Sequence, residues 1–499
     1  MSRSTVLFDN PSPDALRSVS AIGRLTGASA ALAAVEIARE STRPLLLLAT
    51  DPRNADLLEA EARFFAGDDL PIMHFVEWET LPWDSFSPHQ DIISQRLSVL
   101  SALPTAQRGI TIASTPVLLQ RLPPTNYVNA RSLALQQGQT LDRQQFVQQL
   151  ASAGYLRVPQ VTEHGEFAVR GSLLDVFPMG AVAPIRIDFF DDDIESLRTF
   201  DPETQLSGGE IATVSMLPAR EIPLDAASVK AFRLRYRERF EGQPSRSRVY
   251  RDVSDGIAHG GIEYYLPLFF DATATLVDYL PRDSIVMAPK DYEQILELTW
   301  QEIEERHELC SLDPERPILK PAETFVAPND IRSRLGEMEQ IRFSANSLAE
   351  APQTVNVQTR IPPAIRIETR YDDAAAALIG FLSSFDGRVL FTAESPGRRE
   401  AVLELLRSRS VTVQRIDNWS DFVASSANVA VTVAPVEAGV VLPAANIAII
   451  SEQQLFGEKP RQRNRRRRKE RDPETIIRQL NDLDEGAPVV HADYGVGRY

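Results

Sequence analysis

Cysteine is almost absent from this chain: there is one in 499 residues, Cys310. A single thiol cannot form an internal disulfide, and it cannot supply the cysteine clusters that hold structural zinc. Long apolar runs are absent as well, since no stretch approaches the roughly 20 consecutive apolar residues of a membrane-spanning helix. The beginning of the chain lacks the apolar core of a signal peptide. The sequence therefore predicts a cytoplasmic protein with no membrane segment.

Lysine is scarce: the chain has five, and none of them follows a glycine. A P-loop for ATP has the pattern G-x-x-x-x-G-K-[ST], in which the glycines let backbone amides approach the phosphates and the lysine offsets their charge. The corresponding stretch keeps Gly23 and Gly27 but reads ASAA at 28–31, where the turn and the lysine are expected. We predict a degenerate, non-functional nucleotide-binding loop. Weak anion binding at the start of the following helix is the alternative.

Positive charge is scarce outside one block. The net charge is −16, and 461–471 holds eight basic residues against one acidic residue, which leaves −23 for the remainder. A body of this sign repels nucleic acid and suits protein partners, unless local basic patches override the average. The block itself could contact DNA or could be a solvated linker. Its candidate contacts are Arg465, Arg466, Arg467, Arg468 and Lys469.

Acidic and histidine side chains form no recognisable catalytic or metal-binding pattern. None of the six histidines stands at a spacing typical of metal ligands. The run Asp191, Asp192 and Asp193 could suggest magnesium, but three adjacent carboxylates at a tight turn are more typical of a solvated hairpin loop. We therefore expect no catalytic residue, no metal site and no cofactor in this chain.

Strand and helix signals alternate in the first part of the chain, as they do in parallel α/β folds. Buried strands are predicted at 44–50, 72–78 and 109–115, and a helix at 54–65. From about residue 127 a helix is followed by short strands separated by turn residues, which is typical of an antiparallel sheet. We therefore predict a parallel α/β domain split by an inserted small α+β domain.

The second half is predicted to hold a proline-punctuated connector with short strands at 322–363 and another α/β domain. The strands of that domain are expected at 388–394, 411–417, 428–434 and 446–451. Residues 457–473 carry no apolar side chain and cannot offset the entropy of folding, so we predict a solvated linker there. The final residues begin a β-rich element that stops in mid-strand, from which we expect a truncated chain.

The predicted domain boundaries follow from these changes of pattern. They are 1–127 and 218–350 for the two parts of the split domain, 128–217 for the inserted domain, 351–455 for the second α/β domain, whose role is unknown, 456–485 for the basic linker and 486–499 for the start of a further domain.

Two exposed arginines and a phenylalanine are the best candidates for an interaction site. Period-two alternation at 166–177 and 184–190 places Arg170 and Arg186 so that both could project from one face of the inserted domain's sheet. An arginine beside an aromatic residue such as Phe190 has the composition of an interface hot spot. The alternative is an ordinary surface salt bridge to Asp188 or Glu195. The residues alone leave both possibilities open.

Four stretches, at 78–100, 163–180, 185–201 and 490–499, resemble the transcription-repair coupling factor family, and together they span nearly the whole chain. The amino-terminal portion of that family is similar to the excision nuclease subunit UvrB. The resemblance implies a multidomain α/β fold: a UvrB-like split parallel α/β domain with an inserted small α+β domain, then a second α/β domain and a basic linker.

The resemblance also implies partners. Arg170, Arg186 and Phe190 match family positions that contact UvrA, which favours the interface over the salt bridge. The domain that starts at 486 would bind RNA polymerase, and the motor that binds ATP, magnesium and duplex DNA would lie beyond this chain. UvrB's DNA-clamping hairpin has no counterpart, because 83–97 runs on without room for it. We expect a monomeric, non-enzymatic fragment that recruits UvrA to stalled polymerase in transcription-coupled nucleotide excision repair.

Two other functions fit parts of the sequence. The chain could be a UvrB-like subunit that verifies DNA damage with ATP, although the missing Gly-Lys dipeptide counts against this. It could also be a DNA-binding module that uses the basic block.

Overall fold

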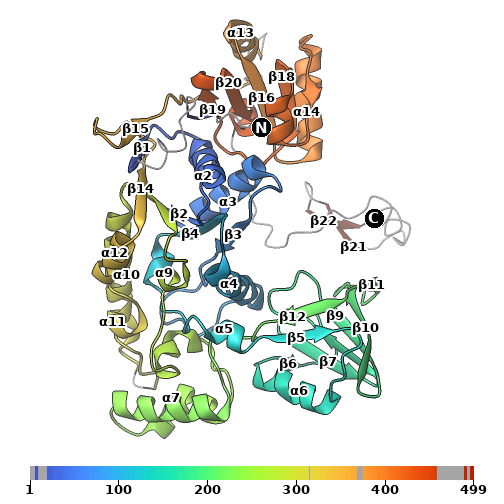
Figure 1. The fold of residues 1–499 in the computed structure, drawn as a ribbon, viewed down its shortest axis with the longest axis vertical. Helices are drawn as coiled ribbons and strands as arrows, with labels where there is room; N and C mark the ends of the chain where they lie inside the picture. Colours follow the sequence, from blue (N-terminus) through green and yellow to red (C-terminus); the bar gives the residue numbers. More distant parts are fainter. Residues whose placement is uncertain are drawn as a thin grey trace. The chain divides into compact units, whose positions relative to one another are not determined.

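The computed structural model describes residues 6–8, 19–313, 315–367 and 375–457, together with two late strands, β21 (Pro488–His491) and β22 (Gly495–Arg498). The chain divides into two compact units, Met1–Phe456 and Gly457–Tyr499 (Figure 1). In the second unit, β21 and β22 pair in antiparallel fashion. The basic block at 465–469, either a DNA contact or a solvated linker by its sequence, lies outside the described residues. No helix in the described part of the chain is both long and apolar enough to span a bilayer.

A seven-stranded sheet and its covering helices form what we call the body. The strand order is β15-β1-β14-β13-β2-β4-β3, and all neighbouring strands run parallel. Three of the strands read LLLLA, ITIAS and IVMAP and are buried along their whole length, as parallel strands between two layers of helices are. The strands are β1 (Ala21–Gly23), β2 (Leu45–Ala49), β3 (Ile72–Phe75), β4 (Ile110–Ser114), β13 (Ile285–Pro289), β14 (Glu339–Phe343) and β15 (Thr354–Asn356).

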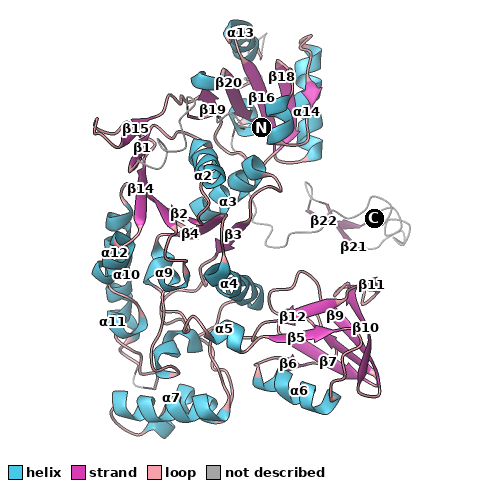
Figure 2. Cartoon of the chain, in the orientation of Figure 1, coloured by secondary structure: helices cyan, strands magenta, loops and turns pink. Residues whose placement is uncertain are grey.

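Helices pack on both faces of this sheet (Figure 2). Successive residues of a strand point to opposite faces, so Leu45 and Leu47 join one core and Leu46 and Leu48 join the other. The first core includes residues of α2 and α3, and the second includes residues of α4, α10 and α12. The helices are α2 (Ser29–Glu40), α3 (Pro52–Ala66), α4 (Gln90–Ala102), α9 (Leu276–Tyr279), α10 (Tyr292–Cys310), α11 (Pro321–Thr324) and α12 (Pro328–Gly336).

The predicted α/β class is confirmed, and strands are present at the three places expected in the first part. The short strands predicted within 322–363 are present as β14 and β15. The segment is more than a connector, because it also contains α12 and both strands belong to the seven-stranded sheet. β15 also falls within the range predicted to be a separate domain, 351–455, although it pairs with β1. In β14, EQIRF, only the central residue is buried, so the sequence does not show that this strand joins the central sheet.

Residues 133–216 leave the body after α5 (Tyr127–Ala130) and then return to it, and we call them the insert. Its six-stranded sheet has the order β11-β10-β9-β8-β7-β6 and is antiparallel except for the β6–β7 pair. Its first and last strands, β5 and β12, form a separate antiparallel pair. The elements are β5 (Leu133–Gln136), α6 (Arg143–Ser152), β6 (Leu156–Arg157), β7 (Glu166–Arg170), β8 (Leu173–Val176), β9 (Ile185–Phe190), β10 (Asp193–Phe200), β11 (Ser207–Glu210) and β12 (Thr213–Met216).

A helical segment follows the insert before the chain re-enters the sheet at β13. It consists of α7 (Ala226–Arg239), η3 (Pro244–Arg246), α8 (Arg248–Ser254) and η4 (Ile262–Leu268). Phe232, Tyr236 and Tyr250 lie in its own small core, so α7 and α8 pack against each other through aromatic side chains.

The second α/β unit, 376–456, has five strands where four were predicted. The order is β17-β18-β16-β20-β19, and the extra strand, β19, is an antiparallel edge. The strand predicted at 411–417 is reduced to two exposed residues, β17. Its elements are α13 (Ala376–Ser384), β16 (Arg388–Ala393), α14 (Pro396–Ser408), β17 (Gln414–Arg415), α15 (Trp419–Ala424), β18 (Val429–Val433), β19 (Val440–Leu442), η5 (Pro443–Ala445), β20 (Ile447–Ser451) and α16 (Glu452–Phe456).

Candidate functional site

The three residues predicted to form an interaction site share one face of the insert's six-stranded sheet. Strand pairing places Arg186 opposite Asp175, and the next row on the same face places Asp188 opposite Leu173, which pairs with Arg170. Phe190 lies two residues after Asp188 and therefore points to the same side. The opposite face is covered, because Phe167 and Ile187 join the core that contains Phe146 and Leu150 of α6. We call the side that carries Arg170, Arg186 and Phe190 the open face.

Arg186 is held by an ion pair within the insert. Its Nε and Nη2 donate to the two carboxylate oxygens of Asp175 at 2.8 and 3.0 Å, and its guanidinium lies 4.9 Å from the centre of the Phe200 ring. The bond to Asp175 raises the pKa of Arg186. The Arg186 side chain is 18% exposed and that of Asp175 1%. A salt bridge is present, but its acid is Asp175, whereas the sequence suggested Asp188 or Glu195. The pairing of β8 with β9 places Asp175 opposite Arg186, and this register is not visible in the sequence.

Arg170 and Phe190 are the outward-reaching members of the open face. Arg170 is exposed at the end of β7, and its Nη2 donates to the Pro159 carbonyl at 2.9 Å. Phe190 is 74% exposed at the end of β9. The acidic run 191–193 forms the exposed turn between β9 and β10, as the hairpin interpretation predicted. An exposed aromatic ring and an exposed arginine can both add a large contact area to a bound protein.

An open depression of about 590 Å³ borders Phe190, and sequence analysis did not predict it. Its floor and rim come from the end of β5, the start of β10 and the segment before β12. The polar side chains there can hydrogen-bond a partner, while the phenyl ring supplies apolar contact. The lining residues are Gln136, Gln137, Gly138, Phe190, Asp193, Ile194, Glu195 and Ala212.

Gly23 and Gly27 stand where a nucleotide-binding loop would lie, between β1 and α2. The backbone amides of this loop are bonded to protein atoms: Arg24 N to the Asn346 carbonyl at 2.9 Å, and Ala28 N to the Ala438 carbonyl at 3.0 Å. Gly27 has φ +54°, and a Cβ there would overlap the carbonyls of Ala438 and Gly439. The loop therefore contacts the second α/β unit, and the amides of Arg24 and Ala28 are already bonded to protein oxygens.

The contact between the second α/β unit and the body also buries a carboxyl group. Glu61 on α3 is 2% exposed and lies near Glu437, which precedes β19. Burial, with a further contribution from the Glu437 carboxylate, raises the pKa of Glu61 from 4.5 to about 8. Trp419 of α15 packs edge-on against Phe65 of α3 with ring centres 5.2 Å apart. The two parts therefore meet through a buried apolar surface that includes one acid.

Glu61 should make the protein less stable as the pH rises. An acid whose pKa is higher in the folded than in the unfolded chain takes up a proton on folding, so its contribution is full below pH 4.5 and is lost towards pH 8. Between about pH 5 and about pH 8 we expect the Glu61→Gln variant to gain roughly 2–3 kcal/mol relative to the native protein. Urea unfolding at several pH values measures this difference.

The control for Glu61 is Glu404→Gln, which changes an exposed carboxylate on α14. Its stability should follow that of the native protein at every pH. Parallel pH profiles for the native protein and Glu61→Gln would contradict the assignment of a buried neutral acid.

The beginning of the segment 83–97, where UvrB's hairpin was predicted to have no counterpart, is fixed to the body. Trp83 is 1% exposed and packs edge-on against Phe325 at 5.6 Å between ring centres. Asp84 accepts a hydrogen bond from Arg306 at 2.5 Å, and Arg316 donates to the Trp83 carbonyl at 2.8 Å. These contacts hold the segment against the body up to the start of α4.

Comparisons with known proteins match two parts of the chain to family models. Residues 133–222 match the UvrB interaction domain, a range that contains the whole insert. Residues 381–455 match the family described as MFD, D3 domain, which covers nearly all of the second α/β unit.

Curated relatives extend the similarity over nearly the whole chain. The transcription-repair-coupling factor of Escherichia coli is 40% identical over 96% of this chain, and that of Haemophilus influenzae 37% over 96%. The corresponding factor of Myxococcus xanthus is 28% identical over 91%. The chain spans 41%, 42% and 40% of the length of these three relatives. The resemblance found in the sequence is confirmed, and the chain belongs to the family of the transcription-repair-coupling factors.

Proposed function

We propose that this chain recruits the excision-repair protein UvrA to stalled RNA polymerase, as a non-motor part of a transcription-repair coupling factor. One observation carries the proposal: the segment that matches the UvrB interaction domain is the insert, and its open face presents Phe190 and Arg170. A factor named for coupling transcription to repair needs a surface that holds a repair protein. The open face is the described surface best suited to that task.

The open face combines one arginine that is held in place, Arg186, with two exposed side chains, Phe190 and Arg170. Arg186 is held by Asp175, so it offers a positive charge at a fixed place. Phe190 offers apolar area beside the depression, where a side chain of UvrA would be shielded from water. Arg170 lies in the next row of this face after Asp175, at the end of β7, and would contact the edge of the interface. The main contribution to affinity should therefore come from Phe190.

Phe190→Ala should weaken the binding of UvrA by roughly 10- to 30-fold, which is about 1.4–2 kcal/mol. The fold should be unaffected, because the ring is 74% exposed and its removal leaves no buried cavity. Calorimetric titration of UvrA with the whole chain measures the affinity, and a thermal melt checks the fold. Arg170→Ala should weaken binding less, by a few-fold, since Arg170 lies at the edge.

A matched control is Leu298→Ala, which removes an apolar side chain that is 54% exposed on α10, outside the insert. It should leave the affinity unchanged. Arg186→Ala is a poor test, because it would leave the buried Asp175 carboxylate without its partner and destabilise the insert. Equal affinities of Phe190→Ala and the native chain for UvrA would remove the open face from consideration.

We also propose that this chain does not hydrolyse ATP. The loop at Gly23 and Gly27 lacks the lysine that offsets phosphate charge, and the amides of Arg24 and Ala28 are bonded to protein oxygens. ATP, magnesium and the motor's grip on duplex DNA would belong to the part of the family that this chain does not span. Hydrolysis of ATP by the purified chain would contradict this and favour the UvrB-like damage-verification function.

The remaining expectations concern the setting of this activity. We propose that 486–499 begins a domain that contacts RNA polymerase, that the chain is monomeric, and that it acts in the cytoplasm.

A further inference from the structure

The segment that contains α7 and α8 reverses the charge of the chain. Residues 226–254 hold eight basic and three acidic residues, a net charge of +5, in a protein of net charge −16. Arg235 pairs with Asp271 and Arg239 pairs with Glu323, which fixes α7 to the body. The other six basic side chains are exposed. They are Lys230, Arg233 and Arg237 on α7, Arg246 in η3, and Arg248 and Arg251 on α8. We call these six the basic face.

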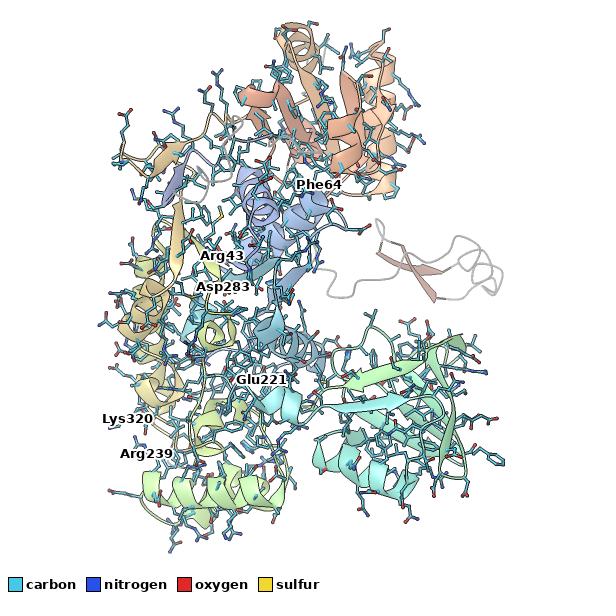
Figure 3. All side chains as sticks on the ribbon, in the orientation of Figure 1. Arg43, Phe64, Glu221, Arg239, Asp283 and Lys320 are labelled. Carbon is cyan, nitrogen blue, oxygen red and sulfur yellow. The ribbon has the colours of Figure 1, made fainter. Side chains whose placement is uncertain are left out.

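Packing between the helices brings these cations together. Tyr236 and Tyr250 lie 5.1 Å apart between ring centres, and the guanidinium of Arg237 lies 5.5 Å from the centre of the Tyr250 ring. Arg233 Nε donates to the Tyr250 hydroxyl at 3.4 Å, so Arg233 and Arg237 of α7 both contact the same residue of α8. Figure 3 shows the side chains of α7 standing out at the edge of the body, away from its sheet, with Arg239 labelled.

These cations are largely free of competing carboxylates. Within the part of the chain that the structure describes, only Arg248 of the six has an ion pair, a 3.7 Å contact to Asp252, and its side chain remains 78% exposed. Lys230 and Arg237 are two turns of helix apart, so they lie roughly 10 Å from each other. The basic face is therefore a set of spaced positive charges that a repeating anion can meet.

The surroundings of these charges favour a nucleic acid backbone over a protein. Phe232, Tyr236 and Tyr250 are buried, and Leu234 is the one large exposed apolar residue on α7, at 60%. A protein interface normally needs an apolar centre, and single-stranded nucleic acid is normally bound by exposed aromatic rings. Phosphates of a duplex need only spaced cations. We propose that the basic face binds the phosphate backbone of duplex DNA without reading its sequence.

Salt-dependent DNA binding by the whole chain tests this. Each cation that neutralises a phosphate adds about −0.9 to the slope of log K against log salt. The triple variant Lys230→Gln, Arg246→Gln, Arg251→Gln should make this slope shallower by roughly 2–3 and weaken binding at low salt at least tenfold. The control triple, Arg157→Gln, Arg282→Gln, Arg407→Gln, removes the same charge from exposed positions elsewhere and should leave the slope unchanged.

The basic block at 465–469 is a second source of DNA affinity, so both triples are also compared in a chain where its five basic residues are glutamines. The difference between the triples should persist there. Equal effects of the two triple variants on DNA binding would overturn the proposal. So would a complete loss of DNA binding when only the five basic residues at 465–469 are replaced by glutamine. Equal affinity for single-stranded and duplex DNA would also overturn it. Arg233 and Arg237 are left unchanged because both contact Tyr250, so replacing them could disturb the packing of α7 against α8. The single variant Arg248→Gln should make the slope of log K against log salt shallower by about 0.9.

Discussion

Replacing Arg96 by methionine should lower the free energy of unfolding by about 3–5 kcal/mol. Arg96 on α4 is completely buried, and its Nε donates to Glu221 Oε1 at 2.6 Å. Its Nη1 donates to the Val76 carbonyl at 2.7 Å and to Gln120 Oε1 at 3.0 Å. Methionine would fill similar space but would leave the Glu221 carboxylate, 1% exposed, with no counter-charge.

A second substitution, at Glu221, shows whether the loss of stability comes from an unpaired charge or from altered packing. The double variant Arg96→Met, Glu221→Met removes both charges and should recover a large part of the lost stability, because no ion is left stranded in the interior. Urea unfolding of the native chain, the single variant and the double variant completes the comparison. A single variant within about 1 kcal/mol of the native chain would contradict the buried ion pair.

Gly27→Ala should loosen the second α/β unit from the body and destabilise the chain by about 2–4 kcal/mol. Alanine at φ +54° is strained, and its Cβ would also overlap the backbone carbonyls of Ala438 and Gly439, which cannot swing aside as a side chain can. The Ala28 amide would then lose its bond to Ala438. Hydrogen exchange should become faster around α2 and at the turn before β19.

The variant Gly67→Ala separates the two expected causes of destabilisation in Gly27→Ala, which are backbone strain and steric overlap. Gly67 has a similar φ of +59°, and a Cβ there would meet nothing within 4 Å, so this change measures backbone strain alone. Because Gly67 combines this φ with a ψ of −142°, a conformation that residues other than glycine rarely adopt, the change should cost about 1–3 kcal/mol and leave the exchange of α2 unchanged. Equal losses in the two variants would mean that the approach of Gly439 to the loop adds nothing.

The elements found from the sequence are those whose pattern follows directly from burial. LLLLA and ITIAS are strands buried on both faces, so every residue is apolar and the stretch is visible without knowing its neighbours. β14, β15 and β17 each have few buried residues, and their strand character comes from the neighbours they pair with. Short strands were expected in these regions, but their extent and their place in a sheet follow from tertiary structure, which sequence alternation does not report.

The candidate site was only partly visible in the sequence for a similar reason. The expectation that Arg170 and Arg186 share a face agrees with the strand pairing, although alternation decides only which residues within one strand share a face. The partner of Arg186 depends on the register between β8 and β9, and both Asp188 and Glu195 were wrong. The basic face was missed because the sequence of α7 does not reveal which arginines are paired with Asp271 and Glu323.

Both ends of the insert are rooted in the body: the Tyr127 hydroxyl donates to the Arg220 carbonyl at 3.1 Å, where the departing and returning chains meet. A load applied to the insert is consequently shared by two covalent connections. One leads back to β4, and the other leads forward to β13, both in the central sheet. A partner that pulled on the open face would thus strain the whole body as one mechanical element, where a domain on a single flexible tether would simply swing.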